Sequence, residues 1–200
     1  EKPADLHLEC LEPGPAPSRL GPTGLTSHLA PTADRVVDMT AFWADFGGQH
    51  LARNEVNSFD HVQSTQGAAS LMGGSLDQGY GQAWWRVAGD EALLYEVEVP
   101  NCVYWGVQLG DVWYQSLDWV NRQSSLNGHQ ASISDDGVFR AVISQRDPGI
   151  ANWLDTSGAT QGCITYRWNQ AGSSPVPTLR LIPFAELEGS LDDRWIRISP

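Results

Sequence analysis

The sequence predicts a mainly β protein: an antiparallel, jelly-roll-like β-sandwich with one amphipathic helix near residues 33–52. From residue 82 onward, apolar and polar residues alternate in short runs separated by Gly, Pro, Asn and Asp, which is typical of strands with one buried face. Between residues 33 and 52, apolar residues recur every three or four positions, as on a helix. The 200 residues are 41% hydrophobic and 18% charged, so the chain can bury a core.

Three segments are expected along the chain. Residues 1–32 would hold an N-terminal strand, from the alternation at residues 6–11, and a Pro-rich linker. Residues 33–81 would form the helix, with Asp34 as its N-cap, and glycine-rich loops that pack on the sandwich. Residues 82–200 are the predicted β-sandwich domain.

The glycine-rich stretch at residues 67–81 lacks the Gly-Lys-Ser/Thr of a phosphate-binding loop, so it is interpreted as a flexible loop over a sheet. Beyond it, a hairpin turn is expected at Asp135-Asp136-Gly137, because Gly tolerates a positive φ. Four alternate residues are expected to line one face of a strand: Val103, Trp105, Val107 and Leu109. The expected strands cover residues 92–99, 103–109, 130–134, 138–144, 162–169 and 178–184.

The composition of the chain limits which classes of partner and which compartment are expected. The net charge of −12 argues against nucleic acid, because an acidic chain repels phosphate backbones. No apolar run approaches the roughly 20 residues that a membrane-spanning helix needs. The three cysteines, Cys10, Cys102 and Cys163, are expected to be free thiols in a cytoplasmic protein, since an odd count without a signal peptide favours a reducing compartment. The scattered His and Cys residues predict neither a metal site nor a cofactor.

The densest polar stretch is residues 113–130, where amide, hydroxyl and charged side chains lie among aromatic residues. Such groups either brace a long loop through hydrogen bonds or line a polar pocket, and the sequence leaves both interpretations open. A second cluster follows at residues 146–156. Core packing explains most of the nine tryptophans, although exposed indole faces beside Asn, Asp and Arg are also where sugar rings stack.

These motifs, in this order, resemble the bacterial family called domain of unknown function 1214, over about residues 90–185. The resemblance rests on YWGVQLGDVWYQSLDWVNRQSSLNGHQ (104–130), DDGVFRAVISQRDPGIANWLDTSG (135–158) and ITYRWN (164–169), with Trp119 where Tyr is common and Ser157 where Ala is. It implies a jelly-roll-like sandwich that is the C-terminal portion of a longer protein, and it leaves the activity open. The family motif falls on Asp118, Asn121, Arg122, Gln123, Ser125, Asn127, Asp147, Asn152, Trp153, Asp155 and Arg167.

Three functions remain open at this point. The first is a sandwich that binds a small polar ligand, for example a carbohydrate-like one, in a cavity lined by Trp, Asn, Asp and Arg. The second is a hydrolase or isomerase in which Asp118 or Asp155 is the acid or base and Arg122 holds an anion or oxyanion. The third is a purely structural or assembly domain, whose motifs only secure the sandwich. Whichever holds, the expected partners are a small-molecule ligand and a second copy of the chain or a further N-terminal portion. The expected ligand-binding residues are Trp105, Gln108, Trp119, Asn121, Gln123, Asn127, Asn152, Trp153 and Arg167.

One side-chain pairing follows from electrostatics. Arg122 and Asp155 lie in two separate motifs, and a guanidinium inside a sandwich needs a carboxylate. We therefore expect Arg122 to pair with Asp155 first, and with Asp118 or Asp147 next, at the rim or floor of a cavity.

Overall fold

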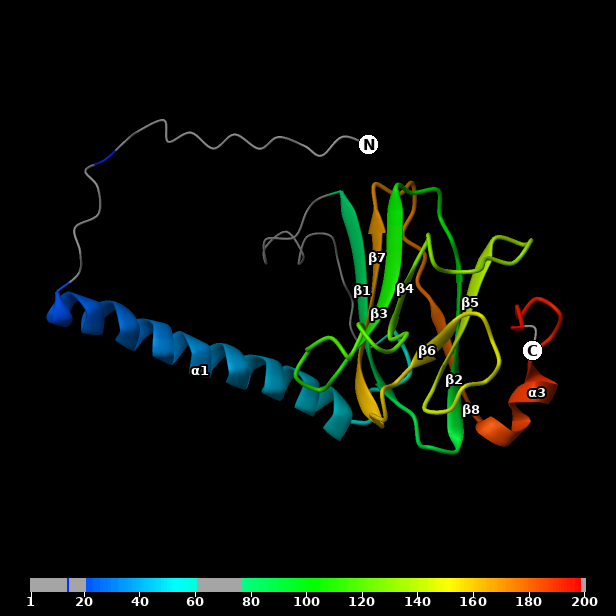
Figure 1. The fold of residues 1–200 in the computed structure, drawn as a ribbon, viewed down its shortest axis with the longest axis horizontal. Helices are drawn as coiled ribbons and strands as arrows, with labels where there is room; N and C mark the ends of the chain where they lie inside the picture. The colour runs from blue at the N-terminus through cyan, green and yellow to red at the C-terminus, as the bar shows by residue number, and fades with distance from the viewer. Residues whose placement is uncertain (1–13, 15–20, 61–76, 199–200) are drawn as a thin grey trace. The chain divides into compact units, whose positions relative to one another are not determined.

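A computed structural model of the chain describes residues 14, 21–60 and 77–198. The chain divides into two compact units, residues 1–39 and 40–200, and the helix α1 (Pro22–Ala52) belongs to both. The second unit contains two four-stranded sheets packed as a sandwich, which confirms the predicted fold class (Figure 1). The strands are β1 (Gln78–Arg86), β2 (Glu91–Glu98), β3 (Tyr104–Gly110), β4 (Ser125–Asn127), β5 (Val138–Ser144), β6 (Trp153–Asp155), β7 (Gln161–Asn169) and β8 (Thr178–Pro183).

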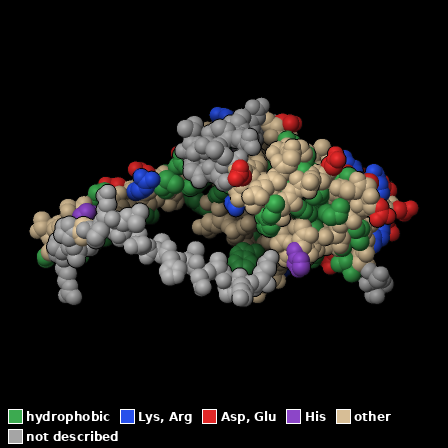
Figure 2. All heavy atoms as spheres, turned by 90° about the horizontal axis from the view of Figure 1, so that it is seen from above, with side chains coloured by type: hydrophobic (Ala, Val, Ile, Leu, Met, Phe, Trp, Pro, Cys, Tyr) green, Lys and Arg blue, Asp and Glu red, His purple; other side chains and the backbone are tan. Residues whose placement is uncertain are grey.

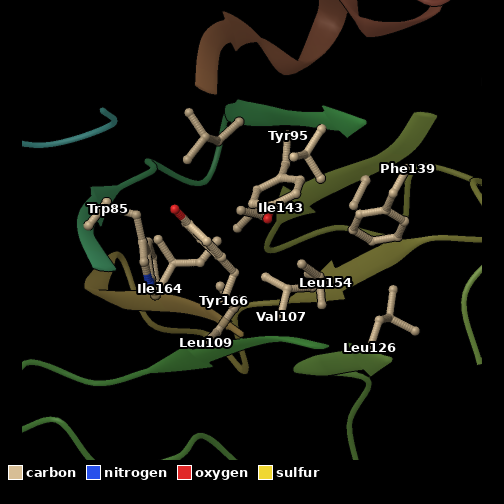
Figure 3. Close-up of a cluster of buried hydrophobic side chains, with 14 of the residues drawn as sticks. Trp85, Tyr95, Val107, Leu109, Leu126, Phe139, Ile143, Leu154, Ile164 and Tyr166 are labelled. Carbon is tan, nitrogen blue, oxygen red and sulfur yellow. The ribbon is translucent and has the colours of Figure 1, made fainter. Parts of the chain in front are cut away.

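The strand order is β1-β7-β3-β4 in what we call the first sheet and β6-β5-β2-β8 in the second sheet. Period-two alternation turns every other side chain of both sheets into a shared core. Figure 3 shows Tyr95, Phe139 and Ile143 of the second sheet on one side of this core, with Val107 and Tyr166 of the first sheet opposite. The residues between these buried positions therefore face outward on each sheet.

The outer face of the second sheet is also covered. Leu94, Val142 and Ile182 form a second apolar cluster with Leu187 and Trp195 from the C-terminal segment. That segment begins with the short helices η1 (Phe184–Glu186) and α3 (Leu187–Ser190), which the alternation pattern did not predict. The two central strands of the second sheet, β2 and β5, are thus buried on both faces, whereas the edge strand β8 is mostly exposed.

The helix begins earlier than predicted. We expected it over residues 33–52 with Asp34 as N-cap, but α1 starts at Pro22, so that Asp34 lies inside it and residues 22–32 are not a linker. Pro31 removes only one backbone donor from this long helix, and hydroxyls on both sides of it bond back to the preceding turn, among them Thr32 Oγ1 to the His28 carbonyl at 2.9 Å. The expected strand at residues 6–11 lies outside the described residues.

Several strand boundaries also differ. Residues 78–81 belong to β1 rather than to the expected glycine-rich loop, most of which lies outside the described residues. Val103 is 74% exposed and precedes β3, so it does not share the buried face. Residues 130–134 form only an isolated bridge, from Ile133 to Phe139, because the chain there turns toward other loops. The short strand β6 pairs with β5 in parallel, an exception to the predicted antiparallel arrangement.

Residues 40–52 of α1 cover one edge of the first sheet. Trp84 points outward from β1 yet is fully buried, because Phe46 and His50 lie against its ring with centroid distances of 6.2 and 6.4 Å. A Cβ atom at Gly47 would lie 2.6 Å from the Trp84 ring, so only glycine allows the helix to approach this closely. The rest of the outer face of the first sheet is where polar residues gather.

On the face shown in Figure 2, acidic and basic side chains of the described residues lie intermixed rather than in one continuous basic area. Of the helices in the described residues, none has the length and apolar character of a membrane span. Cys102 and Cys163 are free thiols, as predicted, and Cys10 lies outside the described part of the chain.

Candidate functional site

The outer face of the first sheet presents polar residues from all four of its strands. Outward positions that are far apart in the sequence become neighbours through strand pairing. One row across the sheet contains Tyr80, Arg167, Gly106 and Asn127. The next row contains Gln82, Thr165, Gln108 and Ser125.

Two adjoining pockets open on this face. One has a volume of about 110 Å³ and the other about 160 Å³. They share Gln108, Thr165 and Arg167, so we treat them as one groove and call it the trough. Its lining consists of Tyr104, Gly106, Val107, Gln108, Leu109, Gly110, Tyr114, Gln115, Ser116, Ser125, Leu126, Asn127, Gln130, Cys163, Thr165 and Arg167.

Gly106 forms part of the floor of the trough. It stands between Arg167 on β7 and Asn127 on β4, where any other residue would raise a side chain from the sheet. A Cβ atom there would lie 3.0 Å from the hydroxyl of Tyr104, whose ring leans over the position. The missing side chain therefore makes room for the Tyr104 hydroxyl beside the flanking polar groups.

One end of the trough is closed by the loop after β3. Tyr114 in this loop has a φ of +66°, a conformation that non-glycine residues adopt only when neighbouring contacts hold them there. Its ring stacks on Trp43 of α1 at 4.7 Å, and its hydroxyl donates to Oε1 of Gln82 at 2.9 Å. Burial raises the pKa of Tyr114 to about 12, so the phenol stays protonated as a donor.

Further hydrogen bonds fix the same loop. The carboxylate of Asp111 accepts from the backbone N–H groups of Trp113 and Gln115, at 2.8 and 2.9 Å. Gln108 donates from Nε2 to the Ser116 hydroxyl at 2.5 Å, which ties the sheet to the loop across the trough. This wall is consequently held from the helix side, the sheet side and within itself.

Arg167 is the charged residue of the trough. Its guanidinium carbon lies 5.4 Å from the centre of the Tyr80 ring, a cation–π contact. None of the trough's lining residues is acidic, and within the described residues Arg167 has neither an ion pair nor a side-chain hydrogen bond. A guanidinium with five donors is therefore free to bind a ligand.

Other polar groups beside Arg167 are also unoccupied. Asn127 uses Oδ1 to accept from the backbone of His129 and Gln130, which orients the side chain and leaves its Nδ2 donor without a partner among the described residues. Thr165 and Ser125 place hydroxyls on the same face of the sheet. The trough thus combines one fixed charge with several neutral donors and acceptors.

The predicted pair of Arg122 and Asp155 is present. Nη1 of Arg122 lies 3.0 Å from Oδ2 of Asp155, and the other oxygen of Asp155 accepts from the Ser157 backbone at 2.8 Å. The side chain of Asp155 is 4% exposed and that of Arg122 is 55% exposed. Neither residue lines the trough, so the pair links the loop at residue 122 to β6.

Three more expected ligand-binding residues form hydrogen bonds to the backbone. Asn152 is buried and bonds to Ser132 and to the Arg140 carbonyl. Gln123 donates to the Trp153 carbonyl at 2.6 Å, and Trp153 Nε1 donates to the Ser144 carbonyl at 3.1 Å. Of the two interpretations of the polar motifs, these contacts favour the bracing network.

The remaining expected residues lie in different surroundings. Asp118 accepts from Nδ2 of Asn121 at 3.1 and 3.0 Å, and these hydrogen bonds lower the pKa of its carboxyl. Trp119 is 64% exposed, whereas Trp105 is buried in the core between the sheets. Of the nine expected ligand-binding residues, the trough brings together Gln108, Asn127 and Arg167.

Sequence reasoning missed Gly106, Tyr114 and Thr165 as site residues. Thr165 could have been found, because it alternates with buried residues two positions before Arg167. Gly106 and Tyr114 gave no such signal, since a glycine in a strand and a tyrosine in a loop acquire their roles only from their neighbours in space.

Comparisons with known proteins support the fold. Over 85% of this chain, the structure is similar to that of an uncharacterized protein from Burkholderia cenocepacia, with a TM-score of 0.77 and 33% sequence identity. The match covers 46% of that protein, so the chain spans less than half its length. The VPA0106 protein from Vibrio parahaemolyticus also matches, at 13% sequence identity and a TM-score of 0.41.

No family model matches the chain, and neither does any curated protein. The resemblance to the domain of unknown function 1214 family therefore stays a prediction. Residues 21–60 and 77–198 contain no group of three or more His, Cys, Asp or Glu residues that could hold a metal ion.

Proposed function

We propose that this protein binds a small polar ligand in the trough on the outer face of the first sheet. The observation that carries the proposal is the meeting of two pockets at Gln108, Thr165 and Arg167, where an unpaired guanidinium lies among neutral hydrogen-bonding groups. Ligand sites in proteins are concave and hold a few well-placed polar groups, and the trough has both properties.

The rigidity of the trough supports the same proposal. The loop that carries Tyr114 is held by Trp43, Gln82 and its own backbone, so its wall exists before a ligand arrives. A preformed site loses little conformational entropy on binding, which favours affinity for small molecules.

The enzymatic alternative gains no comparable support. Both oxygens of Asp155 are engaged, one by Arg122 and one by the Ser157 backbone. Hydrogen bonds from Asn121 lower the pKa of Asp118, so its carboxyl is ionised at neutral pH, which does not suit a general acid, and is a weaker base than an ordinary carboxylate. Neither carboxylate lines the trough.

A thermal-shift screen with neutral sugars, polyols and organic acids tests the proposal, because a ligand stabilises the folded state that binds it. Gly106→Val fills the floor with a side chain that suits a strand, and we expect it to remove the stabilisation. Gly89→Val is the matched control, since a Cβ atom there meets nothing closer than 3.5 Å, in the turn between β1 and β2.

Stabilisation of the wild type and of Gly89→Val, but not of Gly106→Val, is the expected result. Equal stabilisation of Gly106→Val would place the ligand elsewhere and overturn the proposal. So would a screen in which no compound stabilises the wild type.

A further inference from the structure

The charge inside the trough restricts the ligand more closely than its shape does. Arg167 is the charged member of the lining, and every other lining residue is apolar or neutral and polar. Two other arginines of the sandwich pair with carboxylates: Arg140 with Glu96 and Asp136, and Arg122 with Asp155. Arg167, in contrast, is exposed and pairs with no carboxylate of the described residues, and its guanidinium lies over the face of the Tyr80 ring.

We infer that the ligand of the trough is a small monocarboxylate, with its carboxylate at Arg167 and Asn127 and its neutral part extending toward Tyr114 and Ser116. This inference rests on the proposed function and adds the chemical class of the ligand. A planar guanidinium donates two parallel hydrogen bonds to a carboxylate, which gives both strength and orientation. Nδ2 of Asn127 lies in the same row of the sheet as a further donor without a partner among the described residues.

A single negative charge fits this site better than two. The trough offers one cation, whereas a phosphate monoester carries nearly two charges at neutral pH and would keep one of them unpaired. The chain as a whole carries −12, so its field disfavours the more highly charged anion.

The neutral part of the ligand follows from the other end of the trough. Around Thr165 the lining changes to Gln108, Ser116 and Tyr114, which supply amide, hydroxyl and ring surfaces without charge. Hydroxyl groups or a small ring on the ligand would bind there, and a second carboxylate would not find a counter-ion.

Isothermal titration calorimetry with matched pairs of compounds tests the inference. The probes are lactate with lactamide, benzoate with benzamide, and inorganic phosphate, each titrated into the wild type, Arg167→Met and Arg180→Met. Arg180 is the control, because it is an exposed arginine on β8 of the other sheet and lies outside the trough. Each amide keeps the shape of its carboxylate and removes the charge.

We expect at least one carboxylate to bind about ten-fold or more tightly than its amide, since a charge-assisted pair of hydrogen bonds is worth that factor or more. This preference should disappear in Arg167→Met and persist in Arg180→Met. Phosphate should bind the wild type more weakly than that carboxylate.

Three results would overturn the inference: no carboxylate binds, carboxylate and amide bind equally, or phosphate binds most tightly. The proposed function is tested separately, by Gly106→Val, and fails if this variant is stabilised as much as the wild type. If a neutral compound bound the wild type and Arg167→Met equally but did not bind Gly106→Val, the trough would stand as a ligand site. Only the assignment of a carboxylate ligand would then fail.

Discussion

Asn152 offers the sharpest test of whether the polar motif at residues 146–156 is scaffold or site. The residue is 3% exposed, and its side chain makes three hydrogen bonds to backbone groups. Oδ1 accepts from the Ser132 N–H at 2.9 Å, and Nδ2 donates to the carbonyls of Ser132 and Arg140 at 2.6 and 2.8 Å. The side chain thereby joins the loop at residue 132 to β5.

Replacing Asn152 by Ala should destabilise the fold by about 3–5 kcal/mol. The Arg140 carbonyl is buried and would lose a hydrogen-bond donor at a cost of about 1–3 kcal/mol. The two Ser132 groups are half-buried, so water can reach them and each loss costs about 1 kcal/mol. The total is a large part of the roughly 5–15 kcal/mol by which domains are stable.

Urea denaturation followed by tryptophan fluorescence measures this cost. Asn121→Ala is the matched control, because Asn121 is exposed and, among the described residues, its side chain bonds only to Asp118, so its loss should change stability by less than about 0.5 kcal/mol. Asn152→Ala should still bind the trough ligand. A cost below about 1 kcal/mol, or a loss of ligand binding by a stably folded variant, would refute the scaffold interpretation.

Three further predictions concern other side chains. Arg122→Met should cost about 1–3 kcal/mol in urea denaturation, because it leaves the buried Asp155 without its counter-ion, and a cost near zero would contradict this. Arg140 lowers the pKa of Asp136 to about 2. The stability that this ionised carboxylate contributes is therefore present above its unfolded pKa of about 4 and is lost as pH falls toward 2. Asp136→Asn should flatten that part of the pH–stability curve, and an unchanged curve would argue against the pair. Burial raises the pKa of Cys163 to about 12, so iodoacetamide at about pH 8 should modify this thiol only after unfolding. Mass spectrometry measures the modification, and rapid labelling of the folded protein would contradict this prediction.

The sequence predicts the sandwich because its longer strands carry their own signal, whereas the three-residue strands β4 and β6 were not predicted. In β1 and β3, buried residues recur at alternate positions, and that local pattern needs no knowledge of the strand's neighbours, whereas β2 and β5 are buried at nearly every position. The start of α1 was harder to predict, because Pro31 resembles a helix boundary in sequence and yet lies inside the helix.

The candidate site could be predicted only in part, for a related reason. Gln108, Asn127 and Arg167 stand out as polar residues within motifs, but the sequence does not say that β7 lies between β1 and β3. That strand order brings Tyr80, Arg167 and Gly106 into one row, in which the glycine raises no side chain from the sheet. The motifs with the most polar residues, around Asp118 and Asp155, instead supply hydrogen bonds and an ion pair outside the trough.

Crystal soaking with the same carboxylates and amides, and with neutral sugars, tests the central claim most directly. The account predicts density for a bound compound over Gly106, within hydrogen-bonding distance of Arg167 and Asn127 and bounded by Tyr114. Density beside Arg122 and Asp155, or a trough that stays empty while another surface is occupied, would contradict it.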